Sequence, residues 1–162
     1  MTEADHSQDT QRPSSFPWPP MLLAAAVVGA WWMNRSHPLD WPGLDDLPAR
    51  IIGLGLGVAG IALFVWAALT LRRANTTILP HAGASTLVTD GPFRWRRNPI
   101  YLADILMLLG LAELTKNVWL VILAAVFAVL VTWLAILPEE RHLEAKFGDA
   151  YRDYKERTRR LF

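Results

Sequence analysis

The sequence predicts an all-α integral membrane protein with four transmembrane helices, which form one domain over residues 16–162. Three observations support this prediction. The chain of 162 residues is 52% hydrophobic and contains 8 Trp, which is more apolar surface than so short a soluble chain can bury. The apolar residues gather in four windows, at 16–33, 51–71, 100–114 and 118–137. Lys and Arg concentrate in the segments that alternating spans place on one side.

The distribution of basic residues predicts the orientation of these helices. The second and fourth windows are about 20 residues long, the length that a helix needs to cross roughly 30 Å of hydrocarbon. If all four windows cross, thirteen of the 16 Lys and Arg lie on the side of the N-terminus, the loop 72–99 and the C-terminal tail. Because cytoplasmic segments carry an excess of Lys and Arg, we expect both termini in the cytoplasm. The absence of Cys excludes disulfides, thiolate chemistry and Cys-based zinc sites.

The N-terminal third holds no candidate site. Residues 1–15 are polar and lack periodicity, so we expect a disordered tail. The first window ends in Trp31 and Trp32, an aromatic pair typical of the headgroup level of a membrane. The connector 34–50 contains three Pro and one Gly, and we interpret its His37 and Asp40 as surface residues rather than ligands.

The second window contains glycines at the spacing G-x-G-x-x-G, at Gly55, Gly57 and Gly60. A dinucleotide-binding loop with this spacing requires a preceding strand and a later acid, and an uninterrupted apolar run provides neither. Gly53 and Gly57 also form G-x-x-x-G, which lets two membrane helices approach closely. We therefore predict a helix contact here, either within the chain or in a homodimer.

Residues 86–101 read TLVTDGPFRWRRNPIY and form the centre of the predicted site. A turn at 90–92 is followed by two aromatic residues and three arginines. Asn98 is a favourable N-cap because its side-chain oxygen can accept a first-turn amide, and Pro99 fits the first helical position. A helix start beside three guanidinium groups suits an anionic ligand. His81, in the preceding loop, is interpreted as exposed.

The third window carries two acids in an apolar helix. Helical spacing places Tyr101, Asp104 and Leu108 on one face. Asp104 lies about one turn inside the apolar region, where an ionisable group is costly, so it is a functional candidate. The alternative is a carboxylate that reaches water or pairs with an arginine. Glu113, at the opposite end of the helix, is predicted to be solvated.

A tight turn at 115–117 predicts an antiparallel hairpin of the third and fourth windows. The return of the chain brings Glu139 and Glu140 to the level of Asn98 and Tyr101. Beyond Pro138 an apolar stripe recurs at helical spacing on an otherwise charged tail, which predicts amphipathic helices that lie on the membrane or cap the site. The stripe consists of Leu143, Phe147, Tyr151 and Tyr154, and Gly148 predicts a break between two helical pieces.

The residue types at this end of the chain suit one kind of ligand. The cations and the helix start suit a carboxylate or phosphate, and the aromatic residues Phe93, Trp95 and Tyr101 suit a flat ring or a cation. Glu139 and Glu140 suit hydroxyls or an amine. A nucleoside that carries an amino group and an acid uses all three. The motifs of Ser-His-Asp hydrolases, P-loop nucleotide binding and H-E-x-x-H metalloproteases are absent from the sequence.

The ordered motifs of the C-terminal half resemble a superfamily of membrane enzymes, the isoprenylcysteine carboxyl methyltransferases and phospholipid methyltransferases. The matching pieces are L-V-T-x-G-P-[FY] at 87–93, R-[NH]-P-x-Y at 97–101, Gly110, the pair Glu139-Glu140, and L-x-x-x-F-G-x-x-Y-x-x-Y at 143–154. The resemblance covers about residues 76–160, roughly half of the chain. The ordered set is far more specific than any single piece.

The resemblance implies a methyltransferase that binds S-adenosyl-L-methionine at the cytoplasmic face of a bacterial inner membrane. An in-line displacement at the sulfonium methyl depends mostly on positioning and desolvation. The implied acceptor is a carboxylate, amine or hydroxyl of an isoprenoid or lipid, and neither nucleic acid nor a metal is expected. Carried over by position, the cofactor-binding residues are Ser85, Thr86, Leu87, Val88, Gly91, Phe93, Asn98, Pro99, Ile100, Tyr101, Glu139 and Glu140, and the catalytic residues are Arg97, Tyr101 and Glu139.

Two positions depart from the eukaryotic carboxyl methyltransferases. Asn98 stands where they carry His, and Ala135 stands where they carry the arginine for the substrate carboxylate, so the acceptor stays open. Two alternative functions also stay open. Sterol reductases share an R-[HN]-P-x-Y element but use NADPH, and a non-enzymatic scaffold would bind anionic lipid through the Arg-rich loop and the amphipathic tail.

Overall fold

The computed structural model describes residues 18–42, 46–75 and 86–162. Within these ranges the chain is helical and contains no β-strand, which confirms the predicted all-α class for the described residues. The predicted disordered tail at 1–15, His81 and the predicted site residue Ser85 lie outside the described residues.

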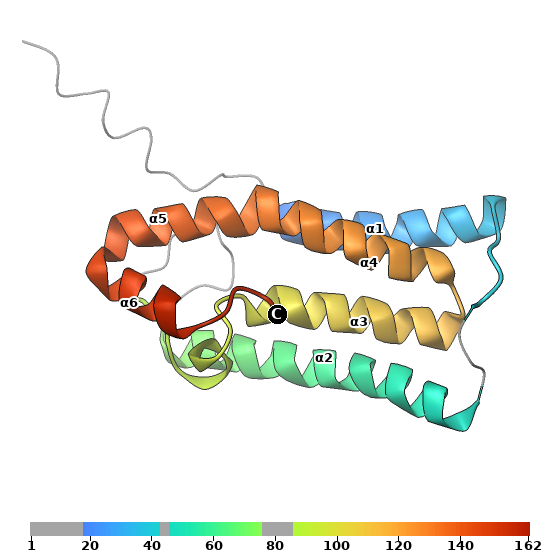
Figure 1. Ribbon diagram of the computed structural model, residues 1–162, viewed down its shortest axis with the longest axis horizontal. Coiled ribbons are helices and arrows are strands. Elements are labelled where there is room, and N and C mark those ends of the chain that lie inside the picture. The colour runs from blue at the N-terminus through green and yellow to red at the C-terminus, as the bar shows by residue number, and fades with distance from the viewer. Residues whose placement is uncertain (1–17, 43–45, 76–85) are drawn as a thin grey trace, which may run out of the picture.

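Each of the four apolar windows forms a helix, and the helices run side by side (Figure 1). α3 lies between α2 and α4, while α1 packs along α4. The bounds are α1 (Trp18–Ser36), α2 (Leu47–Arg73), α3 (Pro99–Thr115) and α4 (Val118–Val131). The predicted windows are therefore confirmed as helices, to within a few residues at each end.

A second group of short helices gathers where α3 begins and where α4 is continued (Figure 1). The short 3₁₀ helix η3 (Gly91–Arg94) precedes α3. α4 continues through the π-helical turn η4 (Thr132–Ile136) into α5 (Leu137–Phe147), and α6 (Asp149–Arg157) follows. The break predicted at Gly148 is confirmed, because this residue lies between α5 and α6 with a left-handed φ of 55°.

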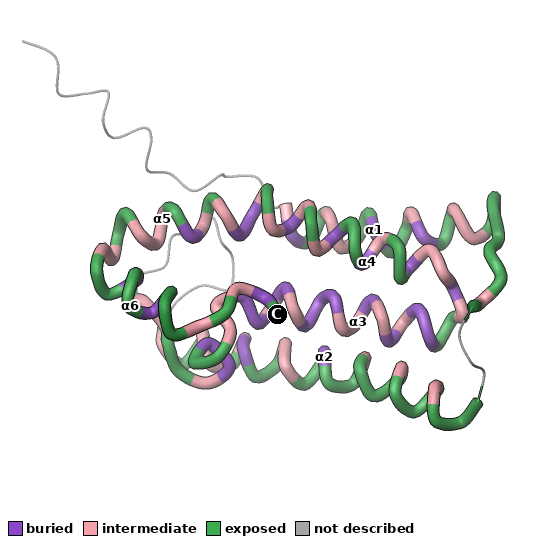
Figure 2. Tube along the Cα trace, viewed as in Figure 1, coloured by how far each residue is buried: buried purple, intermediate pink, exposed green. Residues whose placement is uncertain are grey.

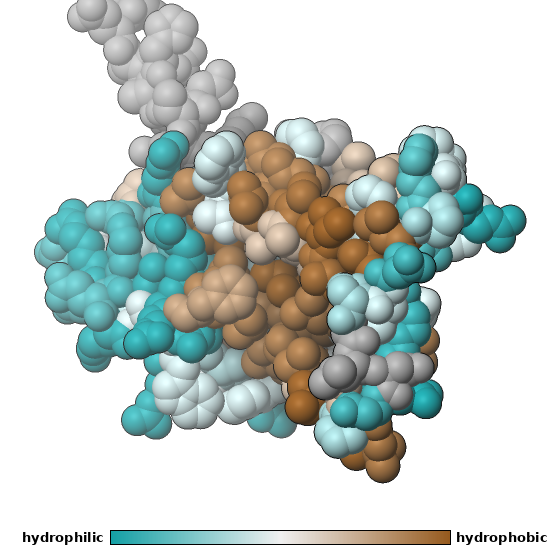
Figure 3. Space-filling model, turned by 45° about the vertical axis from the view of Figure 1, so that its right-hand side comes forward, coloured by the Kyte–Doolittle hydropathy of each residue, from teal (hydrophilic) through white to brown (hydrophobic). Residues whose placement is uncertain are grey.

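In the described part of the chain, two helices are long and apolar enough to cross a membrane. They are α2 and the continuous helix Val118–Phe147, with mean hydropathies of 2.3 and 3.0 over their most apolar windows. Only 11% of that window in α2 is buried inside the protein, and its outer surface carries exposed Ile52, Val58 and Ile61. Figure 3 shows an apolar middle between hydrophilic ends on one face of the molecule. Such a surface fits a lipid environment, whereas the spanning of α1 and α3 stays a prediction.

α3 is the most buried of the long helices (Figure 2), and glycines of α2 allow its close approach. A Cβ built at Gly57 would meet the Cα atom of Gly110 at 3.1 Å. A Cβ at Gly60 would lie 2.8 Å from the carbonyl oxygen of Ala103. The G-x-x-x-G spacing therefore serves a contact within the chain, as one of the two sequence interpretations predicted. A Cβ at Gly55, in contrast, would meet no atom within 4 Å.

The far end of the bundle is fixed by helix caps. Asp46 caps α2 by accepting a hydrogen bond from the Ala49 amide at 2.9 Å. Asn117 accepts from the Trp119 amide at 3.0 Å, and its amide group donates to the carbonyl oxygen of Ala30 at 3.1 Å. The predicted turn at 115–117 is thus confirmed, and it also ties α4 to α1.

The structure corrects the prediction that Glu113 is solvated. This side chain is 8% exposed and forms an ion pair with Lys116. It lies against Gly53, where a Cβ would come within 2.3 Å of the Glu113 Cγ. The absence of a side chain at Gly53 leaves the space in which the Glu113 stem is buried, and Lys116 compensates its charge.

The π-helical turn before Pro138 was not predicted. Pro138 has no amide hydrogen, and in a regular helix its ring would clash with the carbonyl group four residues earlier. The wider turn from Thr132 to Ile136 relieves this crowding, and the Leu137 amide donates to the Thr132 carbonyl oxygen. The hydroxyl of Thr132 donates to the Ala128 carbonyl oxygen at 2.6 Å. The chain consequently continues as one long helix past the proline.

The glycine contact can be tested by substitution. A Cβ at Gly110 would lie 2.3 Å from the Gly57 Cα, so Gly110→Ala should destabilise the fold by about 1–3 kcal/mol through overpacking. Gly55→Ala is the matched control, and it should be neutral or stabilising by up to about 1 kcal/mol because alanine favours helix. Thermal unfolding in detergent, followed by circular dichroism, measures both. Equal melting temperatures for the two variants would contradict the proposed contact.

Candidate functional site

We call residues 90–97 the Arg-rich turn. This turn is held between α2 and α6. Gly91 has a φ of 58°, and a Cβ at this position would lie 2.7 Å from the Thr70 hydroxyl oxygen at the end of α2. Both its conformation and its close contact therefore require glycine. Phe93 is buried, and its carbonyl oxygen accepts a hydrogen bond from the Tyr154 hydroxyl at 2.7 Å. The turn is thereby fixed from both sides.

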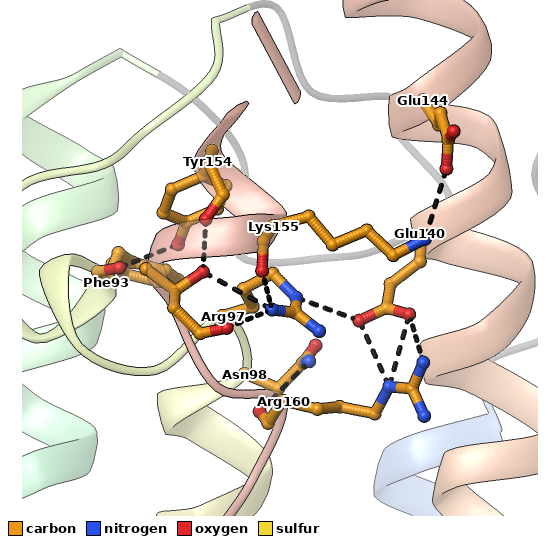
Figure 4. A network of polar contacts seen from close by, with 9 residues as sticks. Phe93, Arg97, Asn98, Glu140, Glu144, Tyr154, Lys155 and Arg160 are labelled. Atoms are coloured by element: carbon orange, nitrogen blue, oxygen red, sulfur yellow. Dashed lines mark hydrogen bonds and ion pairs between the residues drawn. The ribbon is translucent and has the colours of Figure 1, made fainter. Parts of the chain in front are cut away.

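Arg97 connects this turn with two distant segments (Figure 4). Its Nε donates to Glu140 Oε1 at 3.0 Å, and the two side chains are only 9% and 7% exposed. Its Nη1 donates to the carbonyl oxygens of Lys155, at 3.0 Å, and Thr158. The guanidinium group thus joins α5 and the end of α6 to the start of α3. The predicted convergence is confirmed for Arg97 of the turn and Glu140 of the two acids.

Arg160 completes the same network. Its Nη2 donates to Glu140 Oε2 at 2.7 Å, and its Nε contacts both oxygens at 3.1 Å. These hydrogen bonds raise the pKa of Arg160 above its ordinary value. We call the side chains of Arg97, Glu140 and Arg160 the clasp. Charge-assisted, bidentate bonds of this kind are among the strongest in proteins.

The clasp holds the C-terminal segment along the Arg-rich turn. The Arg97 amide donates to the Arg159 carbonyl oxygen at 2.9 Å, and the Arg159 amide donates to the Trp95 carbonyl oxygen at 3.2 Å. Leu161 is then 6% exposed and belongs to the same apolar cluster as Tyr101. The last residues therefore contribute to the core beside the site.

The structure corrects the predicted role of Asn98 as a side-chain cap. Asn98 is the N-cap residue of α3, but its side chain accepts no amide of the first turn. Its Nδ2 instead donates to the Arg160 carbonyl oxygen at 3.3 Å. The Arg160 carbonyl oxygen competes for this side chain, so Asn98 does not cap the first amides of α3. Pro99 occupies the first turn as predicted.

Tyr101 and Glu139 form a second polar group next to the clasp. The Tyr101 hydroxyl donates a long hydrogen bond of 3.5 Å to Glu139 Oε2. Tyr101 is 7% exposed, and Glu139 is partly buried at the start of α5. Asp104 follows three residues later on the same face of α3. Tyr101 of α3 and Glu139 of α5 thus meet at the border of the apolar bundle.

Asp104 is buried one turn further along α3. Its residue is 5% exposed, and no described residue forms a hydrogen bond or an ion pair with its carboxylate. No arginine of the described residues pairs with Asp104, so that part of the alternative interpretation is not supported. The predicted common face with Tyr101 and Leu108 is confirmed, since all three are buried.

The remaining predicted residues divide into two groups. Gly91 and Phe93 lie in the turn that the clasp fixes, and Pro99 and Ile100 follow in the first turn of α3. Thr86, Leu87 and Val88 lead into the turn without regular structure. Trp95, which was expected to contact a ligand ring, is exposed and packs edge-on against Trp66 of α2 with ring centroids 5.8 Å apart.

Sequence reasoning missed Arg160 and the hydroxyl bond of Tyr154. Both depend on contacts across 20 and 61 residues of chain, which no local motif reveals. The helical spacing of the tail did indicate that Tyr151 and Tyr154 face inward, and both are buried. Burial raises the pKa of each of these two phenols above its ordinary value, so they stay neutral near pH 7.

The sequence of this chain matches one family model and is similar to two known proteins. The model of the phospholipid methyltransferase family matches residues 48–150. The nickel-cobalt-cadmium resistance protein NccN of Alcaligenes xylosoxydans xylosoxydans is 29% identical over 143 residues, which cover 88% of this chain and 59% of that protein. The cobalt-zinc-cadmium resistance protein CzcN of Cupriavidus metallidurans is 29% identical over 113 residues, which cover 67% of this chain and 48% of that protein. The chain thus spans about half the length of the curated relatives it matches.

The family match includes the glycine contact, the Arg-rich turn and the acids of α5, and it covers more than half of the chain. The membrane character of the two apolar helices is consistent with it. On this basis the chain belongs to the phospholipid methyltransferase family.

Proposed function

We propose that this protein transfers a methyl group from S-adenosyl-L-methionine to a lipophilic acceptor in the membrane. The observation that supports this function best is the convergence of the Arg-rich turn with Glu139 and Glu140 at one end of an apolar bundle. A polar site at this place can take a water-soluble donor from one side and a lipid from the other. Membership in the phospholipid methyltransferase family supports the same reaction.

The charges around Glu139 fit such a donor. Two arginines compensate Glu140, whereas no Lys or Arg of the described ranges pairs with Glu139. A partly buried carboxylate without a cation favours a positively charged ligand. S-adenosyl-L-methionine carries an ammonium and a sulfonium group. Its carboxylate suits the amides at the start of α3, which the Asn98 side chain leaves without a cap.

The residues of the chain would act mainly by binding and orientation. S-adenosyl-L-methionine supplies, when bound, a methyl group on a positively charged sulfur. The first amides of α3 would orient its carboxylate, and Glu139 would accept hydrogen bonds from its ammonium group or ribose. Tyr101 holds Glu139 in place by its hydroxyl. The apolar faces of α3 and α4 would exclude water and fix the acceptor, which provides the main rate advantage of such a transfer.

Arg97 has a positioning role in this proposal. Its hydrogen bonds go to Glu140 and to the C-terminal backbone, so the guanidinium group acts on the donor through the turn that it holds. This differs from the catalytic role that the resemblance implied. Tyr101 and Glu139 keep the roles that the resemblance assigned to them.

We also propose the membrane topology that the charge distribution indicates. All four long helices cross the bilayer, both termini lie in the cytoplasm, and the site faces that side. The basic residues of the tail and of the Arg-rich turn support this orientation. A bacterial inner membrane is the expected location.

The names of the two relatives point to metal resistance. Among the residues that the structure describes, no group of three or more His, Asp or Glu gathers in a way that could hold a metal ion. We infer that a contribution of this chain to metal tolerance would depend on methyl transfer. In a host sensitive to cobalt, the wild-type protein would then restore growth and Glu139→Gln would not.

Binding of the donor should depend on Glu139. We expect Glu139→Gln to weaken the binding of S-adenosyl-L-methionine at least tenfold, because hydrogen bonds to a charged group contribute about 1.5–3 kcal/mol. Glu144→Gln is the matched control, since this acid of α5 is partly exposed to solvent and pairs only with Arg152 and Lys155 among the described residues. The thermal shift of the detergent-solubilised protein measures both affinities.

The same assay separates the alternatives. Stabilisation by NADPH but not by S-adenosyl-L-methionine would favour a reductase. Stabilisation by anionic lipid alone would favour a scaffold. Equal donor affinities for Glu139→Gln and Glu144→Gln would contradict the proposed site.

The clasp should contribute to stability. We expect Arg97→Gln to lower the free energy of unfolding by about 1.5–3 kcal/mol, because it removes nearly buried charged hydrogen bonds while Arg160 still compensates Glu140. Arg152→Gln breaks exposed ion pairs and should cost less than about 1 kcal/mol. Denaturant titration in detergent compares the two, and an equal loss in both variants would contradict the structural role of Arg97.

Methyl transfer itself is measured in membranes. Vesicles that contain the protein, incubated with donor carrying a tritiated methyl group, should accumulate label in an organic-soluble lipid. Vesicles with Glu139→Gln should accumulate at least tenfold less label at a limiting donor concentration. Label confined to protein or water-soluble products in the wild type would contradict a lipophilic acceptor.

A further inference from the structure

Asp104 is the ionisable side chain that the proposed donor site leaves unexplained. It is 5% exposed and lies where the polar end of the bundle meets its apolar interior. None of the described residues forms an ion pair with its carboxylate. A buried carboxylate of this kind costs several kcal/mol relative to water unless a partner offsets it. Tyr101, which lies one helical turn away on the same face of α3, brings no positive charge and donates to Glu139 instead.

The surroundings of Asp104 on its other side are apolar. Leu108 shares its helical face, and Leu108 and the adjacent Ile105 belong to the core cluster together with Val131 and Ala135. Ala135 lies in the π-helical turn η4 and belongs to the same buried cluster as Tyr101. Asp104 therefore lies where the polar end of the site meets the part of the bundle that suits a lipid chain.

The side chain has the position expected of a group that contacts the acceptor. Glu139 and the first amides of α3 lie at the hydrophilic end, where the donor would bind. Asp104 lies one helical turn deeper, on the face of Tyr101. The tyrosine hydroxyl donates to Glu139, so Tyr101 lies between the two proposed subsites on this face of α3.

We propose that Asp104 accepts the proton of the methyl acceptor, which therefore carries an N–H or O–H group at its reacting atom. This inference rests on the proposed methyl transfer and names a catalytic residue for it. A carboxylate acceptor would meet the uncompensated charges of Asp104 and Glu139, and like charges in a poorly hydrated site repel strongly. A hydroxyl or an ammonium group is instead attracted by the same carboxylate.

The proton and electron balance of the step is complete. An ammonium acceptor first gives one proton to Asp104 and becomes a neutral amine with a free electron pair. That electron pair forms the bond to the methyl carbon, the bond between this carbon and the donor sulfur breaks, and its electron pair stays on the sulfur as a thioether. A hydroxyl acceptor loses its proton to Asp104 while the new bond to carbon forms. General bases of this kind contribute about 10²–10⁴-fold to a rate.

Asp104→Asn is the first test, with Asp104→Ala as a second variant. Both remove a buried charge, so we expect both to fold. Glu113→Gln is the matched control, because it changes another buried acid of α3 that has a cationic partner and lies at the opposite end. Methyl transfer should fall at least 100-fold in both Asp104 variants, whereas their affinity for S-adenosyl-L-methionine should stay within about threefold of wild type.

A binding measurement without the donor provides an independent readout. Dodecylammonium, dodecanol and dodecanoate are titrated into protein in neutral phosphatidylcholine nanodiscs, and tryptophan fluorescence is followed. The wild type should bind dodecylammonium at least tenfold more tightly than dodecanoate. Asp104→Asn should lose this selectivity, and Glu113→Gln should keep it.

The outcomes distinguish this inference from the proposed function. Wild-type rates in Asp104→Asn, or charge selectivity that is equal in wild type and Asp104→Asn, would overturn the role of Asp104. Loss of donor binding together with the rate in both Asp104 variants would also overturn it, because Asp104 would then belong to the donor site.

A wild-type protein that does not bind S-adenosyl-L-methionine would refute the proposed function instead, and the selectivity for dodecylammonium would still report on the acidic subsite. Labelled amine or alcohol lipids in the membrane assay would support the inference, while a labelled methyl ester would overturn it.

Discussion

The site depends on the carboxylate of Glu140, which two arginines from opposite ends of the C-terminal half share. Arg97 comes from the turn before α3 and Arg160 from the segment after α6, and both donate to this one acid. A buried carboxylate requires such compensation, and a buried guanidinium group requires acceptors for its several donors. The clasp therefore fixes three segments at once. It also leaves the neighbouring Glu139 without a cationic partner in the described part of the chain, which makes that position available to a positively charged ligand.

The glycine contact between α2 and α3 fixes the position of α3, whose first turn carries part of the site. Because Gly57 and Gly110 lack side chains, the two backbones meet directly and α3 becomes buried. The start of α3 is then held between the end of α2 and the first turns of α5. Its polar residues come to lie at the hydrophilic end of an apolar bundle, and Asp104 comes to lie at the border. A surface for a soluble donor and an interior for a lipid are thus built from the same helix.

Much of this arrangement could be predicted from the sequence. Hydrophobic windows located the four helices, the turn at 115–117 predicted the hairpin, and the hairpin predicted that Glu139 and Glu140 return to the level of Asn98 and Tyr101. The predictions that were wrong concern side chains whose contacts are decided by distant partners. The Asn98 side chain suits a cap, but the carbonyl group of Arg160 competes for it. Glu113 is expected in water, but the space beside Gly53 and the charge of Lys116 bury it. A local sequence pattern does not show which distant residue a side chain will contact.

The central claim is that Glu139 and the start of α3 bind one methyl donor. The most direct measurement is an experimental structure of the protein in lipid nanodiscs with S-adenosylhomocysteine, the product that carries the same carboxylate, ammonium and ribose groups. The account predicts this ligand with its carboxylate at the first amides of α3 and with its ammonium group or ribose on Glu139. A ligand bound elsewhere, or one that leaves Glu139 without a contact, would contradict the account.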